Sequence, residues 1–444
     1  MGSSKGHGYD ESSVESIVSF ARQLVGKSLA DASNVERSRL TAKGKGGLGV
    51  LVEWAYFDLE VSNKPEPDFQ KAGLELKTTG LSYKNGRLEA KERLKLTAID
   101  YFELATETWL QSRVVRKCGK MLLLTYLYDE TLELADLKFH NLQLQIDLTD
   151  PQSVDTAQFK RDFERIQQLV LEGKAHELSS GDTLYLEAIT SGAGKGRGLK
   201  KQPHSSVLSK PRSFAIKSSY LTALLHGEKD NALLRSADAT LESATSRAFT
   251  PFLGLTVNEI ARRTGVDSSP DSNKGHHRAL VLSILSNGGS SVPELQKADI
   301  ELKTIRARAS GSLREAMSFP SFKYLDIVEE SWEDSEFRRR IERRFLFTIF
   351  KEKSDGSEVL EKVGYWNMPY ADRELARAVW EETRKRVIAG NYDFPKSSES
   401  EVSHVRPKAR NAKDLQRTPQ GTWEKKYAFW LNRSYLQKVV DEIL

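Results

Sequence analysis

Three charged residues in one short segment have the types and spacing of a metal-dependent phosphodiesterase centre. The segment PDFQKAGLELKTT, residues 67 to 79, contains Asp68, Glu75 and Lys77. Carboxylate oxygens are the ligands that Mg²⁺ prefers, and an ammonium group two residues along can orient or deprotonate an attacking water. The segment therefore predicts hydrolysis of a phosphodiester bond, as in a nuclease.

The same segment predicts the element that positions these groups. Its residues alternate, so on a strand Leu74 and Leu76 face one side while Glu75 and Lys77 share the other. The turn-forming NKPEP places Asp68 just before this strand. For a lone ExK, the ordinary alternative is a strand with a solvated Glu/Lys face, and the surrounding segments decide between the two.

Two flanking segments supply further charged groups. GGLGVLVEWAYF predicts a nearly all-apolar helix in which Glu53 is the only charge. Burying an unpaired carboxylate costs several kcal/mol, so a metal ion or a lysine beside Glu53 is the economical explanation. In VVRKCGKMLLLTYLY, Lys117 precedes a second buried strand, expected at residues 121 to 128, and could reach the same site.

These segments resemble a known nuclease family. KGGLGVLVEW, SNKPEPDFQKAGLELKTTGL and VVRKCGKMLLL are similar to the MutH mismatch-repair nicking endonucleases and to the larger two-domain GATC-cutting restriction enzymes related to them. The resemblance implies that Glu53, Asp68 and Glu75 are the metal ligands. It also implies that Lys77 is the lysine of the D…ExK motif and Lys117 an accessory active-site lysine. All five form the predicted catalytic set.

Length and composition predict an intracellular enzyme of two or three domains. The chain has 444 residues, of which 39% are hydrophobic, and no apolar run reaches membrane-spanning length. Cys118 is the only cysteine, which excludes an internal disulfide and fits the reducing cytoplasm of a prokaryote. The polar residues 1 to 12 are expected to be a disordered leader.

The charge distribution predicts a DNA-binding stretch. Net charge is 67 − 62 = +5, which by itself is too small to indicate a polyanionic partner. Between Glu187 and Glu228, however, there are seven basic residues and no acidic one. A solvated loop is the alternative to a glycine-rich loop that follows DNA phosphates. The predicted DNA contacts are Lys200, Arg212 and Lys217.

The sequence also contains an internal duplication. DFQKAGLELKT, beginning at Asp68, recurs as ELQKADIELKT, beginning at Glu294, with seven of eleven positions identical and an offset of 294 − 68 = 226. SFAIKSSYL at Ser213 is echoed by AFWLNRSYL at Ala428. The order of landmarks is kept, so each half is expected to be one copy of the same fold, with a boundary in residues 226 to 245.

The second copy differs where chemistry would be decided. Its counterparts of the first-copy residues are Glu294, Glu301, Lys303 and, opposite Lys117, Arg340. No acid is available at the Glu53 position, and an arginine cannot serve as a neutral base. The resemblance implies a DNA-binding, regulatory second copy, although the retained ExK leaves residual cleavage open.

The predicted fold class is α/β, with two tandem restriction-endonuclease-like domains, each a central mixed sheet flanked by helices. The expected domains are a catalytic MutH-like domain at 13–230 and a degenerate second copy at 231–444. Ser403–Lys426 forms a second basic stripe. Helices are expected at 13–25, 47–60, 156–173, 213–225, 371–388 and 432–443.

The predicted function is a Mg²⁺-dependent type II restriction endonuclease that cuts both strands of duplex DNA, with GATC the site implied by the resemblance. A mismatch-repair-type nickase and a non-catalytic DNA-binding regulator are the alternatives. No membrane partner is expected. Dimerisation on DNA or binding of two DNA sites stays open, and a cognate DNA methyltransferase would be the functional counterpart.

Overall fold

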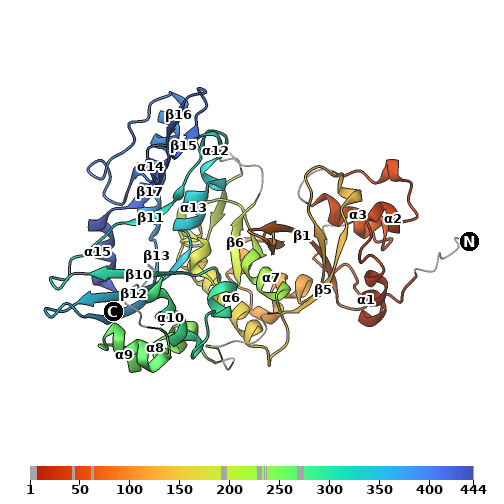
Figure 1. Cartoon of the computed structure of the whole chain (residues 1–444). Helices are drawn as coiled ribbons and strands as arrows, with labels where there is room; N and C mark the ends of the chain where they lie inside the picture. The colour runs from red at the N-terminus through yellow and green to blue at the C-terminus, as the bar shows by residue number, and fades with distance from the viewer. Residues whose placement is uncertain are drawn as a thin grey trace, which may run out of the picture. The chain divides into compact units, whose positions relative to one another are not determined.

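The chain divides into two compact units. The computed structural model describes residues 8–42, 46–61, 65–191, 198–227, 233–234, 236, 238–267 and 275–443. Unit 1 comprises Met1–Asp238 with Gln296–Asp299, and unit 2 comprises Ala239–Leu295 with Ile300–Leu444 (Figure 1). Each unit is a mixed α/β fold, as the sequence predicts.

Unit 1 contains a mixed sheet that carries the ExK segment. Its strand order is β2 (Arg87–Ala90), β1 (Glu75–Lys84), β4 (Lys120–Leu127) and β5 (Phe139–Asp147). Strand β1 is parallel to β4, whereas the β1–β2 and β4–β5 pairs are antiparallel. Both strands predicted from the sequence, β1 and β4, are therefore confirmed and lie side by side.

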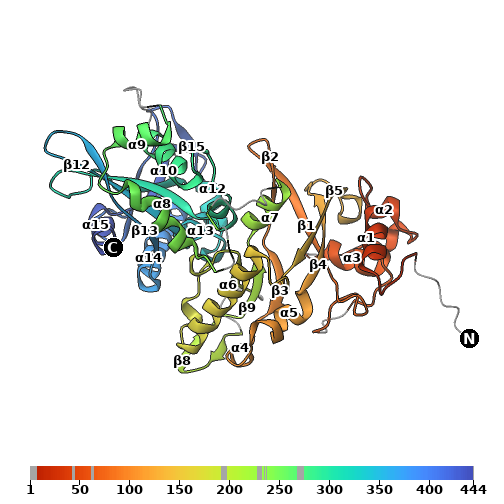
Figure 2. The same ribbon diagram turned by 90° about the horizontal axis from the view of Figure 1, so that it is seen from below.

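A second, antiparallel sheet follows in unit 1. Its order is β3 (Leu94–Ala98), β9 (Arg212–Ile216) and β6 (Leu186–Thr190), and helix α6 (Val154–Leu171) packs on it, as Figure 2 shows from below. The buried Asp162 of α6 accepts hydrogen bonds from the amides of Leu184, Tyr185 and Leu186, which ties the helix to β6. A hairpin of β7 (Lys200–Gln202) and β8 (Ser205–Ser209) completes the unit.

The N-terminal part of unit 1 is held by an aromatic cluster. Helices α1 (Val14–Arg22), α2 (Leu29–Ala32) and α3 (Gly47–Ala55) lie beside β1 and β5 in both ribbon views (Figures 1 and 2). Tyr9 is buried, its ring packs against Phe20, Phe57 and Phe69, and its hydroxyl donates to the Phe57 carbonyl. The prediction of a disordered leader through residue 12 is therefore wrong for residues 8–12, because Tyr9 anchors them. Residues 1–7 lie outside the described part.

Unit 2 repeats the plan of unit 1. Strand β10 (Glu301–Ala307) is parallel to β12 (Arg344–Glu352), which is antiparallel to β13 (Glu358–Asn367). The second sheet has the order β11 (Met317–Ser321), β17 (Tyr427–Leu431) and β14 (Ser403–Pro407). As in unit 1, a separate hairpin is present, formed by β15 (Leu415–Arg417) and β16 (Trp423–Lys425). The duplication predicted from sequence is thus present in the topology.

Most predicted helices are present, with two corrections. Residues 213–225 were expected to be one helix, but the segment is β9 followed by α7 (Ser218–Leu225), because the apolar SFAI run lies in the middle of the second sheet. The helix predicted at 47–60 ends at Ala55. The remaining helices of four or more residues are α4 (Tyr101–Leu104), α5 (Arg113–Cys118), α8 (Leu241–Phe249), α9 (Val257–Thr264), α10 (His276–Ser286), α11 (Pro293–Lys297), α12 (Tyr324–Glu329), α13 (Glu336–Ile341), α14 (Tyr370–Ile388) and α15 (Arg433–Glu442).

Among the described residues, no helix combines the length and apolar character needed to cross a bilayer.

Candidate active site

Strand β1 places Glu75 and Lys77 on one face. A tight turn precedes the strand: Phe69 and Leu74 form an isolated bridge, and Gly73 at its corner has φ +63°, a conformation that glycine adopts without steric cost. The turn brings Asp68 back over the start of the strand. Alternation along β1 then gives Glu75 and Lys77 a common side.

The side chains of this turn and strand interlock. Lys77 Nζ lies 2.5 Å from Glu75 Oε1, and Glu75 Oε2 accepts a hydrogen bond from the Asp68 amide at 3.1 Å. Asp68 Oδ2 in turn accepts from the Leu76 amide at 2.9 Å. Glu75 is 1% exposed, so its charge is compensated inside the protein and not by bulk water.

Glu53 approaches this group from helix α3. The close packing of α3 requires glycines: a Cβ on Gly47 would lie 2.7 Å from Leu134 Cδ1, and one on Gly49 would lie 3.1 Å from Thr78 Oγ1 on β1. Burial raises the pKa of Glu53 to about 7, and the negative charges of Asp68 and Glu75 add to this, against Lys77 and Lys117. Burial also raises the pKa of Glu75, with Asp68 adding and both lysines opposing.

Lys117 completes the set from helix α5. The hydroxyl of Ser112 caps this helix by accepting from the Val115 amide, and the last turn presents Lys117 with its Nζ 3.8 Å from Glu75 Oε1. The neighbouring Cys118 is fully buried, and burial raises the pKa of its thiol to about 12. Cys118 is therefore an uncharged packing residue. The structure brings all five predicted residues into one electrostatic group.

The chemistry of these donors fits a hard divalent cation, but the carboxylates are not arranged around one point. In the described part of the chain, no three acidic, histidine or cysteine side chains are grouped closely enough to hold a metal ion. In this structure the Lys77 ammonium pairs with Glu75 Oε1, and backbone amides donate hydrogen bonds to Glu75 Oε2 and Asp68 Oδ2. Three buried or half-buried carboxylates with two raised pKa values form a site that added positive charge would stabilise.

The predicted DNA contacts have different environments. Lys200 is exposed at the start of the β7–β8 hairpin. Arg212 is buried on β9, where its Nη1 donates to the Ala188 carbonyl, and Lys217 is buried with its Nζ donating to the Ser180 and Thr183 carbonyls. The expectation that Arg212 and Lys217 contact DNA is therefore corrected, because both charged groups lie inside the fold. Most of the glycine-rich loop, residues 192–197, lies outside the described part.

The second copy has an ExK pair of opposite electrostatic character. Lys303 Nζ lies 2.8 Å from Glu301 Oε1, and Arg343 Nη1 lies 3.2 Å from Glu301 Oε2. Burial acts to raise the pKa of Glu301, but the charges of Lys303, Arg343 and Arg340 outweigh it and hold the pKa below its ordinary value. The first-copy glutamate has a raised pKa and the second-copy glutamate a lowered one.

Two second-copy predictions need refinement. Arg340, expected opposite Lys117, lies on α13 with its Nη2 2.8 Å from Glu336 Oε1, and Arg343 makes the contact to Glu301. Arg343 was not among the residues predicted from the sequence, although the run RRRIERR shows a concentration of arginines there. Glu294 is fully buried on α11, and its charge, together with the larger effect of burial, raises the pKa of Tyr365.

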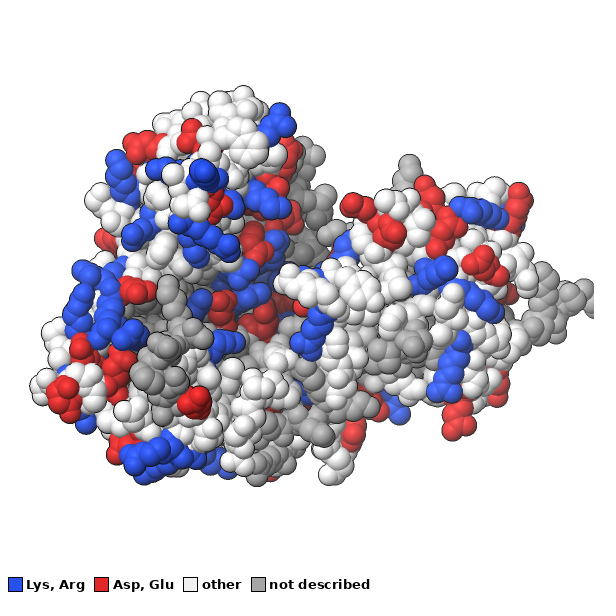
Figure 3. All heavy atoms as spheres, in the orientation of Figure 1, with Lys and Arg blue, Asp and Glu red and all other residues white. Residues whose placement is uncertain are grey.

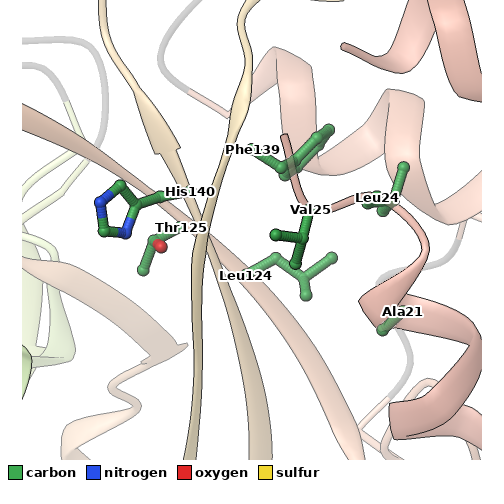
Figure 4. Close-up of a pocket in the computed structure, with 7 residues that line it drawn as sticks. All are labelled: Ala21, Leu24, Val25, Leu124, Thr125, Phe139 and His140. Atoms are coloured by element: carbon green, nitrogen blue, oxygen red, sulfur yellow. The ribbon is translucent and has the colours of Figure 1, made fainter. Parts of the chain in front are cut away.

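A small pocket elsewhere in unit 1 is mostly apolar (Figure 4). Residues from α1, β4 and β5 and the turn after α1 line it: Ala21, Leu24, Val25, Leu124, Thr125, Phe139 and His140. None of the acidic residues described above lines this pocket, so it is separate from the candidate active site.

Comparisons with known proteins match both copies. The family model described as the DNA mismatch repair enzyme MutH matches residues 57–162 and again 284–376. The chain is 27% identical to the type II restriction enzyme Sau3AI of Staphylococcus aureus, over 97% of this chain and 99% of that enzyme. In both copies the chain is similar to the MutH-like endonuclease family.

Relatives named MutH align with about half of this chain. The DNA mismatch repair protein MutH of Vibrio cholerae is 26% identical over 48% of this chain and 94% of its own length. The MutH protein of Serratia proteamaculans is 27% identical over 46% of this chain and 89% of its own length. This chain therefore matches the restriction enzyme over nearly its whole length, and it is a site-specific deoxyribonuclease of that type.

Proposed function

We propose that this protein is a Mg²⁺-dependent type II restriction endonuclease that cuts both strands of duplex DNA at GATC. The observation that carries the proposal is that Glu53, Asp68, Glu75 and two lysines of unit 1 lie near enough to act on one another electrostatically. Similarity to a type II restriction enzyme over nearly the whole chain supports the choice of reaction. GATC itself comes from the family resemblance.

The donor set supports the metal. We assign Glu53, Asp68 and Glu75 as ligands of Mg²⁺, which when bound would polarise the scissile phosphate and lower the pKa of a water molecule. Because Lys77 lies 2.5 Å from Glu75, its ammonium is already at the carboxylate edge where it can orient the attacking water. Lys117, at 3.8 Å, supplies a second positive charge for the phosphate that develops negative charge in the transition state.

We assign DNA binding and regulation, without cleavage, to unit 2. The net charge around Glu301 is positive, because Lys303, Arg340 and Arg343 surround one carboxylate. A site of this sign repels Mg²⁺. Duplex DNA is the partner, a second DNA site or a second protein molecule is compatible with this role, and a methyltransferase of matching specificity would protect the host DNA. We expect the protein to act in a prokaryotic cytoplasm.

The two-copy architecture favours double-strand cleavage over nicking, since the MutH relatives align with half of the chain. Digestion of a supercoiled plasmid that contains GATC sites tests the proposal. Defined linear fragments that require Mg²⁺, and that disappear when the sites are altered, are the expected result. Nicked circles would support the mismatch-repair-type nickase, and unchanged plasmid would support a non-catalytic regulator.

A further inference from the structure

The relict site of unit 2 is a cluster of positive groups around one carboxylate. Lys303 and Arg343 contact the two oxygens of Glu301 at 2.8 and 3.2 Å. Arg340 lies near enough to lower the Glu301 pKa. Each of these four side chains is 22 to 29% exposed, so the cluster is half-buried but reachable from solvent.

A fourth positively charged residue, Lys408 from the C-terminal part of the sequence, belongs to the cluster. Lys408, which follows β14, has its Nζ 3.0 Å from Ser318 Oγ and 2.7 Å from the Phe319 carbonyl on β11. Partial burial lowers the pKa of Lys408, and the charges of Lys303 and Arg340 lower it further. Like charges are therefore held together here at an electrostatic cost.

The charge of this site is the reverse of that in unit 1. Three carboxylates and two lysines meet in unit 1, whereas the unit 2 site combines Glu301 with Lys303, Arg340, Arg343 and Lys408. Arg340 also pairs with Glu336, but that carboxylate is 53% exposed and screened by solvent. A bound cation would stabilise the site in unit 1, whereas a bound anion would stabilise the relict site of unit 2.

The cluster is continuous with the basic stripe predicted at Ser403–Lys426. Lys408 belongs to both, and the stripe leads away from it through exposed basic residues: Arg406, Arg410, Lys413, Arg417 and Lys425. In the space-filling view, Lys and Arg side chains gather over the part of unit 2 where Figure 1 shows α13 and β11 (Figure 3). A polyanion that follows the stripe would reach the cluster.

We propose that the relict site of unit 2 is a metal-independent pocket for one backbone phosphate of duplex DNA, held by Lys303, Arg340, Arg343 and Lys408. Arginine suits this role because its planar guanidinium donates two parallel hydrogen bonds to phosphate oxygens. The phosphate occupies the place that metal and scissile phosphate take in a working copy, and no water is activated there. This inference deepens the DNA-binding role proposed for unit 2 and rests on it.

Binding of the full-length chain to a labelled duplex in EDTA tests the pocket, because metal-dependent contacts are then absent. The double variant Lys303→Gln/Arg340→Gln should lose about tenfold in affinity and reduce the salt slope by about one. The matched control is Lys385→Gln, an exposed lysine on α14 of the same unit, which should bind like the parent. Thermal melting of each variant checks that it is folded.

Glu301→Gln gives the sharpest readout, because it removes the one negative charge in the pocket. The expected result is tighter DNA binding in EDTA, whereas a surviving metal site would show no gain in EDTA and a loss with Mg²⁺. Unchanged or weaker binding of Glu301→Gln, or a double variant that matches Lys385→Gln, would overturn the phosphate pocket.

A further variant separates failure of the pocket from failure of DNA binding by unit 2. If Arg410→Gln/Lys413→Gln in the stripe weakens binding but the pocket variants do not, DNA binding stands and the pocket is wrong. If neither pair changes binding, both assignments to unit 2 fail. Plasmid cleavage by the parent is measured separately and reports on unit 1.

Discussion

The ammonium group of Lys77 lies 2.5 Å from the Glu75 carboxylate, on one face of strand β1. In unit 2, Lys303 and Glu301 repeat this pair at 2.8 Å, but Arg343 takes the other carboxylate oxygen. The motif is thus retained in both copies, and the charges around it differ. Because a metal site needs excess negative charge, we expect Mg²⁺ to bind at the ExK pair of unit 1 and not at that of unit 2.

Replacing a proposed metal ligand should abolish cleavage and spare DNA binding. Asp68→Ala or Glu75→Ala should cost several kcal/mol in the transition state, measured as the loss of cleavage rate at saturating Mg²⁺. Lys71→Ala is the matched control, because Lys71 belongs to the same turn but is 70% exposed and pairs with Glu11. A ligand variant that cuts within tenfold of the parent, about 1.4 kcal/mol, would contradict the assignment.

Replacing the two lysines of the candidate active site should slow cleavage to different extents. Lys77 lies 2.5 Å and Lys117 3.8 Å from Glu75 Oε1, so Lys77→Ala should slow cleavage more than Lys117→Ala does. Single-turnover rates with prebound DNA measure this difference without a contribution from binding. Equal rates for the parent and Lys77→Ala would show that this ammonium does not act on the attacking water.

Metal affinity should depend on pH through Glu53. Burial raises the pKa of this carboxyl from 4.5 to about 7 in the metal-free protein, so Mg²⁺ must displace a proton below about pH 7 and should bind more weakly there. For stability the sign is opposite. Between pH 4.5 and about 7 the folded protein binds more protons at Glu53 than the unfolded chain does, so the metal-free free energy of unfolding should fall as pH rises.

Calorimetric titration of Mg²⁺ at several pH values, with Glu53→Gln as the comparison, checks this prediction. The variant should lose most of the pH dependence together with affinity. A parent protein whose Mg²⁺ affinity is the same at pH 6 and pH 8 would exclude Glu53 as a proton-coupled ligand.

The basic residues near the hairpin should separate into binding and structural roles. Lys200→Ala should leave the melting temperature unchanged but weaken binding to all DNA sequences alike and reduce the salt slope by about one. Lys217→Ala should lower the free energy of unfolding by about 1–3 kcal/mol or more, because buried carbonyls lose their donor. If Lys200→Ala changes neither slope nor affinity, the hairpin is only a solvated surface.

The parts of this site that follow from local pattern could be predicted from sequence. Alternation fixed the shared face of Glu75 and Lys77, and the repeated segment at Glu294 predicted the second sheet. The contact of Arg343 with Glu301 could not be predicted from sequence, because it depends on how helix α13 is spaced from strand β12. Glu75 pairs with Met121, four residues after Lys117, whereas Glu301 pairs with Phe345, five residues after Arg340.

The burial of two basic side chains could not be predicted from the sequence either. Arg212 and Lys217 flank an apolar run whose periodicity fits a buried helix or a central strand equally well. The structure makes this run β9, the middle strand of its sheet, so both side chains enter the interior and bind carbonyls. A count of charges along the chain contains no information about that depth.

Plasmid cleavage by two single variants, Glu75→Ala and Glu301→Ala, tests most directly the claim that unit 1 is the nuclease and unit 2 is not. We predict that Glu75→Ala leaves supercoiled plasmid uncut, whereas Glu301→Ala still gives double-strand fragments with Mg²⁺. Nicked circles from either variant would contradict the assignment of cleavage to unit 1 alone, because each copy would then be cutting one strand.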